Sequence, residues 1–436
     1  MPATIRRYLR YTSWPIIIAM IVLMVVGVLA VSAAEQAKVQ APAYAKKQAI
    51  FAFVGLAAFV ATTLVPYQRF GRAAYPLFAL TLGLLVAVLF LPPIRYCNRW
   101  IPLGPVQIQP SEIAKIAYII LLAWYLRYRD NYRRLLGMFV PFALTLVPIV
   151  LILKEPDLGT SLLFLPTLYV MLFMAGAKWR HLLGIVAVAT AILFMPVPMR
   201  TGANAGGETD VERRALAYWT FRRGQSEYAA IAAPLAIMKP HQLRRIDGWL
   251  RQGDVRLSLE RGLHLRRSKT MLGAGEVAGA GNWEDAQTYM SLLPESRTDF
   301  IFSIAAGRWG FLGCLGILAM YAVIFVFGVE IAVVTHDPFG RLLAVGMLAL
   351  LLTQIFINIG MTMGLMPITG MTLPLVSYGG SSLVVNCAAL GLLVNVGMRR
   401  PILLAKRPFE HGPKREKPLA VRTMAQEPAG AALRER

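Results

Sequence analysis

Long apolar runs alternate with short polar segments along the chain, and this pattern predicts a protein that crosses a membrane many times. A helix needs about 20 predominantly apolar residues to span the hydrocarbon core of a bilayer. Suitable runs occur near residues 14–32, 48–66, 74–92, 113–126, 135–153, 160–177, 181–198, 300–334, 342–363 and 381–398. The sequence therefore predicts an all-α polytopic membrane protein with about ten transmembrane helices.

The spacing of these runs also predicts how the chain is divided. The run 300–334 is too long for one bilayer crossing, so we expect its first turns, up to Gly310, to project beyond the membrane or to bend there. A polar stretch of about 100 residues separates the seventh run from the eighth. The predicted parts are transmembrane helices 1–7 (residues 1–198), a large loop (199–298), transmembrane helices 8–10 (299–400) and a disordered basic tail (401–436).

Composition supports the membrane assignment. The chain is 57% hydrophobic and 16% charged, whereas soluble domains are about 25% charged. Its 45 Lys and Arg residues outnumber 23 Asp and Glu residues, which gives a net charge of +22. The basic residues fall in short clusters between apolar runs, so the charge does not indicate a nucleic-acid partner. Three widely spaced cysteines, Cys97, Cys314 and Cys387, argue against a disulfide framework or a zinc cluster.

The basic clusters predict the orientation of the chain, because cytoplasmic loops carry an excess of Lys and Arg. Counted on alternate sides, one side holds Arg6, Arg7, Arg10, Arg69, Arg72, Arg127, Arg129, Arg133, Arg134, Lys178, Arg180, Arg341, Arg399, Arg400, Lys406 and Arg407. We expect this side to be cytoplasmic, with both termini on it. The large loop then lies outside, since an outward domain of that length translocates regardless of its own charge.

Two segments have open interpretations with respect to membrane lipids. Basic residues are interleaved with aromatic ones from Arg213 to Arg223. This segment suits an amphipathic stretch on anionic headgroups, and equally a solvated loop with a few anchoring aromatics. The tail, 401–436, either touches anionic lipid or, as we favour, stays solvated.

Ionisable residues are costly inside hydrocarbon, so their positions along the chain are informative. The spans are nearly free of interior charge, which argues against a proton pump or an ion-coupled transporter. The unusual residues gather instead at the predicted outer ends of spans. They form five segments, which are Lys47-Gln48, 99–115, 154–161, 294–300 and 358–382.

Several of these residues have both a structural and a functional interpretation. Glu112 and Lys115, three residues apart, share a helix face and can pair, either as an interfacial ion pair with Ser111 as a cap or as part of a site. Asp157 is typical of a turn or a helix cap. Lys47 is typical of a snorkelling anchor.

The last two segments carry stronger signals. Either Thr298 or Asp299 caps the eighth span, or Asp299 is a carboxylate held at the membrane surface beside Arg297. Segment 358–382 alternates Gly, Pro and apolar residues at membrane depth, so its backbone needs partners, and we expect a packed re-entrant or extended turn. Its last residues open the tenth helix, where free N–H groups could hold an anion.

Four motifs in these segments resemble the RodA/FtsW family of shape, elongation, division and sporulation (SEDS) proteins. The most specific is N-I-G-M-x-x-G-L-x-P-x-T-G-x-x-L-P-L-V-S-Y-G-G-S-S at 358–382, supported by P-D-L-G-T at 156–160, Q-P-S-E-x-x-K at 109–115 and P-E-x-x-T-D-F at 294–300. The resemblance covers about residues 14–400. It implies ten transmembrane helices in the bacterial cytoplasmic membrane and a peptidoglycan glycosyltransferase. Such an enzyme polymerises lipid II on the outer face, alongside a class B penicillin-binding transpeptidase.

The resemblance also implies the site. Asp299 matches the family's essential loop aspartate and is the catalytic candidate. The candidates for substrate binding are Lys47, Arg99, Glu112, Lys115, Asp157, Arg297, Ser377, Gly379, Gly380, Ser381 and Ser382. A base would take the proton of the attacking 4-hydroxyl, while cations and N–H groups offset charge on the departing pyrophosphate. No metal-ligand spacing appears and no cofactor is required, although Mg²⁺ or Mn²⁺ could assist at the pyrophosphate.

Three features depart from the family pattern. Gly307-Arg308 stands where the family usually has Glu-Glu, Glu155 replaces the usual Gln before a proline, and the loop stretch 203–265 is longer and more basic. The first departure is expected either to alter the seating of the loop or to indicate a less active paralogue.

Alternatives remain at two levels. Thr369 and Ser161 favour the elongation type, RodA, over the division type, FtsW. A lipid II flippase or transporter would need polar residues along a path across both leaflets, whereas these spans concentrate them at one end. A non-catalytic scaffold of the cell-wall synthesis complex is favoured only by Gly307-Arg308.

Overall fold

The helices of the structure follow the apolar runs of the sequence. The computed structural model of the protein describes residues 11–36, 43–92, 99–103, 106–129, 133–193, 195–201, 219–223, 226–232, 246–250, 252, 263–280 and 297–399. Each predicted run forms a helix: α2 (Trp14–Gln36), α3 (Tyr44–Leu64), α5 (Ala74–Leu89), α6 (Pro110–Leu126), α7 (Phe139–Lys154), α8 (Leu158–Ala175), α9 (Trp179–Leu193), α16 (Ile301–Val334), α17 (Pro338–Met363) and α18 (Gly380–Met398). Among the described residues, seven helical segments are long and apolar enough to cross a membrane, and α5 and α9 are shorter apolar helices. The all-α polytopic prediction is confirmed.

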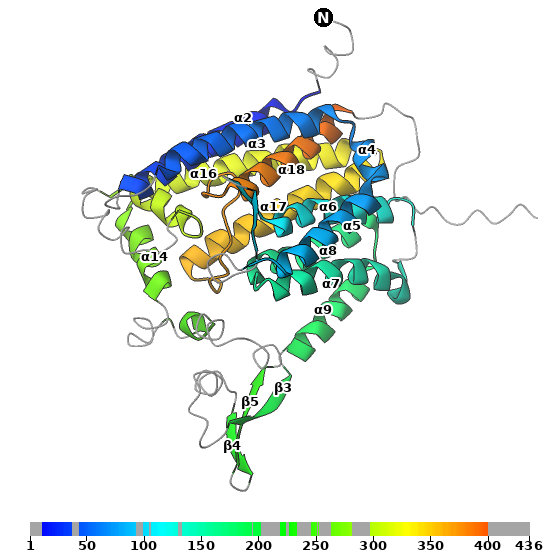
Figure 1. Cartoon of the computed structure of the whole chain (residues 1–436), viewed down its shortest axis with the longest axis vertical. Helices are drawn as coiled ribbons and strands as arrows, with labels where there is room; N and C mark the ends of the chain where they lie inside the picture. The colour runs from blue at the N-terminus through cyan, green and yellow to red at the C-terminus, as the bar shows by residue number, and fades with distance from the viewer. Residues whose placement is uncertain are drawn as a thin grey trace, which may run out of the picture.

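Short elements join these helices. They are α4 (Tyr67–Arg72), a 3-10 helix (Leu135–Met138), α14 (Leu263–Ala274) and the strands β1 (Ile101–Leu103), β2 (Val106–Ile108), β3 (Pro196–Thr201), β4 (Trp219–Arg223) and β5 (Ser226–Ala232). β1 and β2 form an antiparallel pair, and β5 lies between β3 and β4 in an antiparallel sheet. This sheet lies beyond the end of α9, away from the helix bundle (Figure 1).

The strands correct two details of the sequence analysis. The seventh run was expected to be helical to residue 198, but α9 ends at Leu193 and β3 begins at Pro196. Proline disfavours continuation of a helix, because it lacks the N–H donor and its ring clashes with the preceding turn, and Pro196 and Pro198 lie close together here. Residues 219–223 of the aromatic and basic segment form β4, an element that neither interpretation of that segment included. Residues 213–218 and the predicted tail lie outside the described part of the chain.

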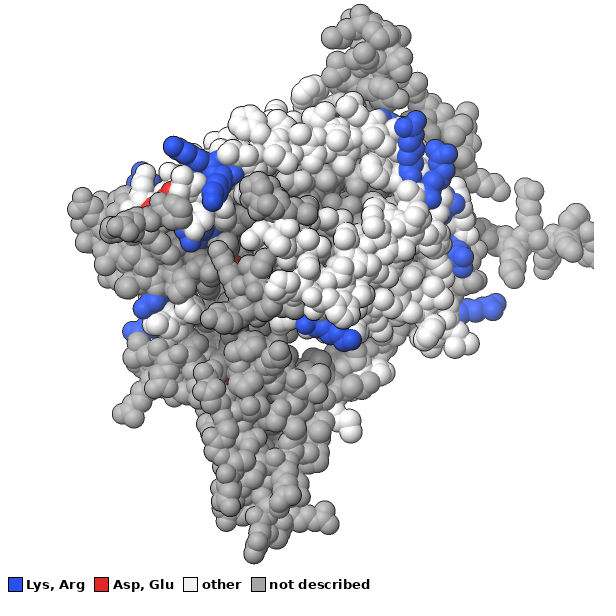
Figure 2. All heavy atoms as spheres, in the orientation of Figure 1, with Lys and Arg blue, Asp and Glu red and all other residues white. Residues whose placement is uncertain are grey.

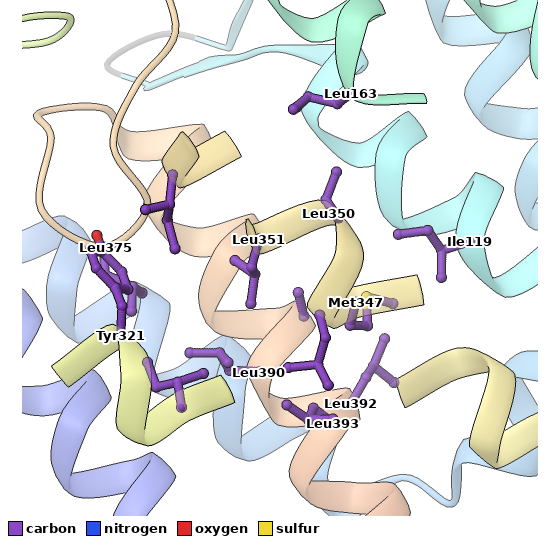
Figure 3. Close-up of a cluster of buried hydrophobic side chains, with 14 of the residues drawn as sticks. Ile119, Leu163, Tyr321, Met347, Leu350, Leu351, Leu375, Leu390, Leu392 and Leu393 are labelled. Carbon is purple, nitrogen blue, oxygen red and sulfur yellow. The ribbon is translucent and has the colours of Figure 1, made fainter. Parts of the chain in front are cut away.

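The centre of the bundle is α17. Of its most apolar 18 residues 83% are buried, against 17% for α3 at the periphery. α17 packs against α6, α8, α14, α16 and α18, while α3 lies along α18 and α2 lies along α16 (Figure 1). Figure 3 shows Met347, Leu350 and Leu351 of α17 among side chains from α6, α8, α16 and α18. The core is therefore built around the two helices that flank segment 364–379.

The surface has the charge distribution of a membrane protein. Many large apolar side chains are exposed on the outer helices, including Phe53, Phe90 and Phe139. Most of the Lys and Arg residues visible in Figure 2 lie at the two ends of the helices, and the surface between them is largely uncharged. A band of this kind matches the hydrocarbon region of a bilayer, where exposed charge is costly.

The predicted bend in the long eighth run is present at Gly310. This residue has φ +67° and ψ −164°, which interrupts α16. The N–H groups of Phe311 and Leu312, which follow the bend, donate to the carbonyls of Glu276 (2.9 Å) and Val277 (3.0 Å). A turn after α14 thus replaces the helical partners that the bend removes, as backbone groups at membrane depth require.

The departure at Gly307 lies where α14 packs on α16. A Cβ on Gly307 would lie 2.1 Å from Cε of Met271, the flexible end of that side chain, so position 307 contacts α14. Ser268 of α14 completes the contact, since its hydroxyl bonds that of Ser303 (2.7 Å) and donates to the Thr362 carbonyl (2.9 Å). Position 307 therefore contacts the loop helix, while Arg308 is exposed.

Replacing Gly310 by Ala tests the bend. A Cβ there would lie within 2.4 to 2.6 Å of backbone atoms of residues 277–279, and positive φ strains any L-residue. We expect a loss of about 2 kcal/mol or more in the free energy of unfolding, measured as a lower thermal midpoint in detergent. Gly316→Ala is the control, because a Cβ at Gly316 meets nothing within 4 Å. Equal midpoints for the two variants would contradict this account of the bend.

Candidate functional site

The segment just before α16 is held in place through hydrogen bonds to its backbone carbonyls. The carbonyl of Arg297 accepts from the Tyr378 N–H (2.9 Å), that of Thr298 from the Ser377 hydroxyl (2.6 Å), and that of Asp299 from Nδ2 of Asn358 (3.1 Å). Three consecutive carbonyls are therefore fixed by residues of α17 and of the turn that precedes α18. We call this arrangement the carbonyl clamp.

The clamp leaves the Asp299 side chain outside the helix cap. The N-cap of α16 is Phe300, with no side-chain cap hydrogen bond, so the interpretation of Thr298 or Asp299 as the cap is wrong. Asp299 is half-buried, and its Oδ2 lies 3.5 Å from the place that a Cβ on Gly370 would occupy. Gly370 has φ +76°, a conformation that favours glycine. The carboxylate is thus positioned at the turn by backbone contacts.

The turn that forms the other side of the clamp is itself tightly held. Ser377 is buried, its hydroxyl accepts from the Leu373 N–H (2.7 Å), and its carbonyl accepts from Nε2 of Gln48 (3.1 Å). Leu375 has φ +66°, which is strained for a non-glycine residue. The Tyr321 hydroxyl donates to the carbonyl of Pro374, next to this strained residue. Figure 3 shows Tyr321 beside Leu375.

The hydroxyls of the two serines near the start of α18 form hydrogen bonds with neighbouring segments and do not cap the helix. Gly379 is the N-cap, with no side-chain cap hydrogen bond. The Ser381 hydroxyl donates to the Gln107 carbonyl (2.9 Å). The Ser382 hydroxyl bonds that of Thr372 (2.9 Å). At Gly380 a Cβ would lie 2.9 Å from the Phe51 ring, so glycine allows α3 to pack closely.

Asp157 begins α8 as its N-cap, as its position in the sequence predicted. Oδ1 accepts from the Thr160 N–H (3.2 Å), and Oδ2 accepts from the Thr160 hydroxyl (2.8 Å) and from Nε2 of Gln109 (3.0 Å). Gln109 also joins this group to α18, since its N–H donates to the Ser381 hydroxyl (3.2 Å). Segments 109–111, 157–160 and 381–382, far apart in sequence, therefore meet.

The start of α8 also reaches the turn beside Asp299. A Cβ on Gly159 would lie 2.5 Å from Met371 and 3.0 Å from the Thr369 carbonyl. The Asp157 cap and the Asp299 carboxylate thus contact the same turn, residues 369–371, from two directions.

The predicted pair of Glu112 and Lys115 is present, and it is buried within the protein. Nζ of Lys115 lies 2.9 Å from Oε2 of Glu112, and both residues are buried. Ser111 is not the cap, because Pro110 opens the helix and Gln109 holds the N-cap position. Removing one charge would leave the other buried without a partner, which is strongly destabilising.

The remaining predicted cations have different surroundings. Arg99 is half-buried, and its guanidinium donates to the carbonyls of Glu155 (3.0 Å) and Pro156, so it fixes the chain before the Asp157 cap. Lys47 is exposed, whereas its neighbour Gln48 is buried against the turn. Arg297 is half-buried, with its guanidinium carbon 3.8 Å from the centroid of the Tyr44 ring.

Sequence reasoning missed the amide side chains that hold the turn. Gln354, Asn358 and Asn386 are buried, and they donate to Thr372, to Asp299 and Met371, and to Ser382. Their signal was available, because polar amides inside otherwise apolar spans are costly and need partners. The described residues contain no group of three or more His, Cys, Asp or Glu side chains that could hold a metal ion.

Glu155, where the family usually has Gln, is fully buried. Neither of its carboxylate oxygens has a hydrogen-bond partner among the described residues. Burial, and next the nearby Asp157 carboxylate, raise the pKa of Glu155 to about 8 against the opposing effect of the Arg99 guanidinium. The side chain is therefore mostly protonated at neutral pH, when it has the shape and neutrality of the glutamine it replaces.

Glu155→Gln should remove a pH dependence of stability. Because the folded-state pKa is raised above the unfolded value, the folded protein holds the proton between about pH 4.5 and pH 8 while the unfolded chain has lost it. Stability of the natural chain should fall across this window and level off above it. We expect the variant's advantage to grow with pH over the same range, to on the order of a few kcal/mol, in thermal unfolding measured at stepped pH. An advantage that does not change with pH would contradict the buried-acid assignment.

Comparison with known proteins places the chain in a family. The FtsW/RodA/SpoVE family model, described as "Cell cycle protein", matches residues 8–206 and 215–401. The peptidoglycan glycosyltransferase RodA of Treponema pallidum (strain Nichols) is 33% identical over 390 residues, covering 81% of this chain and 89% of the relative. The peptidoglycan glycosyltransferase MrdB of Escherichia coli (strain K12) is 32% identical over 351 residues, covering 80% and 84%. The probable peptidoglycan glycosyltransferase FtsW of Geobacter metallireducens is 32% identical over 362 residues, covering 82% and 85%.

Solved structures share the fold. A chain from a study of how polymerization and crosslinking are coordinated in a peptidoglycan synthase complex superposes with a TM-score of 0.69 at 28% identity, covering 89% of this chain and 98% of that one. The crystal structure of the rod shape determining protein RodA of Thermus thermophilus gives a TM-score of 0.59 at 26% identity, covering 89% and 97%. The motifs, the fold and these relatives agree, and the chain belongs to the FtsW/RodA/SpoVE family.

Proposed function

We propose that this protein is a peptidoglycan glycosyltransferase that polymerises lipid II into glycan strands. The observation that carries the proposal is the carbonyl clamp, which fixes the backbone of Asp299 and places its carboxylate beside the turn at Gly370. A general base must be held in a fixed position to reach the proton that it takes. The names of the curated relatives support the same reaction class.

In the proposed reaction, the 4-hydroxyl of one sugar attacks the anomeric carbon of another. Asp299 takes the hydroxyl proton, a new C–O bond forms, and the bond from the anomeric carbon to the lipid pyrophosphate breaks with inversion. The pyrophosphate leaves with the electron pair, and it needs little protonation because it is already a stable anion. Arg297 offsets its charge. Mg²⁺ or Mn²⁺ would act by binding the pyrophosphate of the substrate.

The remaining candidates take supporting roles in this proposal. Arg99 and Asp157 hold the chain at the start of α8, and Ser377 belongs to the clamp. The buried pair of Glu112 and Lys115 stabilises the start of α6. Lys47 is exposed and available to an anionic substrate. Gly379, Gly380, Ser381 and Ser382 shape the start of α18.

The proposed location is the bacterial cytoplasmic membrane, with Asp299 near the outer surface. The basic loops and both termini would then be cytoplasmic, and the large loop outside. The proposed partner is a class B penicillin-binding transpeptidase, since one structural neighbour comes from a study of a complex that polymerises and crosslinks peptidoglycan. Thr369 and Ser161 favour the elongation type within the family.

The scaffold alternative loses its main support. It depended on Gly307-Arg308, but Gly307 contacts Met271 of the loop helix and its departure is accommodated there. The transporter alternative would need polar side chains along the whole span, and the polar groups described above gather at the start of α8, α16 and α18.

Asp299→Asn tests the proposal. We expect glycan synthesis from labelled lipid II, with the transpeptidase partner present, to fall by at least about 100-fold, because amide nitrogen cannot act as the base. Glu330→Gln, an exposed substitution in α16, the helix that follows Asp299, should leave synthesis unchanged. Equal chains from Asp299→Asn and the natural protein would contradict the base assignment. Lipid II translocation in proteoliposomes that survives Asp299→Asn would favour the transporter instead.

A further inference from the structure

We propose that Tyr44 is a positioning residue that holds the Arg297 guanidinium ready to bind the pyrophosphate of the lipid-linked substrate. This inference rests on the proposed function and adds to it the residue that prepares the cation. The guanidinium carbon lies 3.8 Å from the centroid of the Tyr44 ring. That distance is well inside the range of a cation–π interaction, which extends to about 6 Å.

Tyr44 is itself fixed from two sides. It is the first residue of α3, and its N–H donates to Oε1 of Glu35 (3.2 Å), at the end of α2. The second oxygen of Glu35 accepts from the Ala45 N–H (3.1 Å). The Tyr44 ring also packs edge to face on the Tyr378 ring, with centroids 5.2 Å apart and an interplanar angle of 84°. The ring under Arg297 therefore has little freedom to move.

Arg297 is consequently held at both ends. Its carbonyl accepts from the N–H of Tyr378, and its guanidinium lies over Tyr44, whose ring packs on the ring of the same Tyr378. No described carboxylate forms an ion pair with Arg297, in contrast to Lys115, which is paired with Glu112. Within the described part of the chain, the Arg297 guanidinium is therefore positioned by an aromatic ring and not by an ion pair.

The contact with the ring suits an anion binder. A guanidinium that rests its flat face on a ring keeps its five N–H donors, which lie in the plane of the group, for another partner. Phosphate oxygens accept such donors in pairs, which adds both strength and orientation. The ring thereby lowers the entropy that a free arginine would lose on binding a phosphate.

The positions of the two charged side chains also suit the reaction. The Asp299 carboxylate lies against Gly370, whereas the Arg297 side chain lies over Tyr44 of α3. The base and the cation therefore contact different elements, although only one residue separates them. An inverting displacement requires this separation, because the attacking hydroxyl and the leaving pyrophosphate are on opposite sides of the sugar.

The test is a double-mutant cycle on lipid II polymerisation. Tyr44→Leu removes the ring, and we expect KM for lipid II to rise about 3- to 10-fold with a smaller change in kcat. Tyr44→Phe keeps the ring and should restore KM to within about twofold of the natural protein. In the Arg297→Gln background, Tyr44→Leu should have no further effect, because the cation it positions is absent.

A KM increase from Tyr44→Leu that persists in the Arg297→Gln background would show a merely structural role and overturn the proposal. Equal KM values for Tyr44→Leu and Tyr44→Phe would overturn it as well. If Tyr44→Leu does not fold, Tyr44→Trp replaces it: a KM at or below the natural value is expected, and a clear increase contradicts the proposal.

Binding of undecaprenyl pyrophosphate, measured by calorimetry, distinguishes this inference from the proposed function. If the natural protein binds the lipid but makes no glycan, the enzyme proposal fails, and Tyr44→Leu should still weaken binding about 3- to 10-fold. If the natural protein makes glycan and Tyr44→Leu binds the lipid as tightly, the enzyme proposal stands and the Tyr44 proposal fails. If the natural protein neither binds the lipid nor makes glycan, both fail.

Discussion

The structure depends on one constraint: irregular backbone packed among the helices must find hydrogen-bond partners within the protein. Segments 297–300 and 369–379 are both irregular, and each satisfies the other. The carbonyls of the first accept from a serine hydroxyl and an N–H of the second, and from Asn358 beside it. The same contacts that make these segments possible also fix Asp299. The hydrogen bonds that stabilise the two segments therefore also set the position of Asp299.

The surrounding helices and turns also supply hydrogen-bond partners to irregular backbone. α17 and α18 flank the turn and form the most buried part of the core (Figure 3), so the amides that hold the turn project from rigid elements. The bend at Gly310 follows the same rule, because a turn after α14 supplies the carbonyls that the interrupted helix lacks. The irregular segment before α16 and the bend within it thus both find hydrogen-bond partners in segments distant in sequence. The start of α8 packs against the same turn through Gly159.

Features set by local physics could be predicted from the sequence, and features set by tertiary contacts could not. Apolar run lengths predicted the helices, an overlong run predicted the bend near Gly310, and residue type and spacing predicted the Asp157 cap and the pair of Glu112 and Lys115. Strand β4 was missed because short strands depend on their pairing partners. The N-cap before α16 was misassigned because the clamp, which is tertiary, extends the turn to Phe300.

The most direct test of the clamp compares two buried asparagines at opposite ends of the bundle. Asn358 donates to the carbonyls of Asp299 and Met371, and Asn395 donates to those of Thr62 and Val65. Leucine at either position removes two such bonds, and at Asn395 it also removes the acceptor of an Arg399 N–H, so Asn395→Leu should lose at least as much stability as Asn358→Leu. The measurement is the rate of lipid II polymerisation per folded molecule. The account predicts a fall of about 10- to 100-fold for Asn358→Leu and little change for Asn395→Leu, and equal rates for the two variants would contradict it.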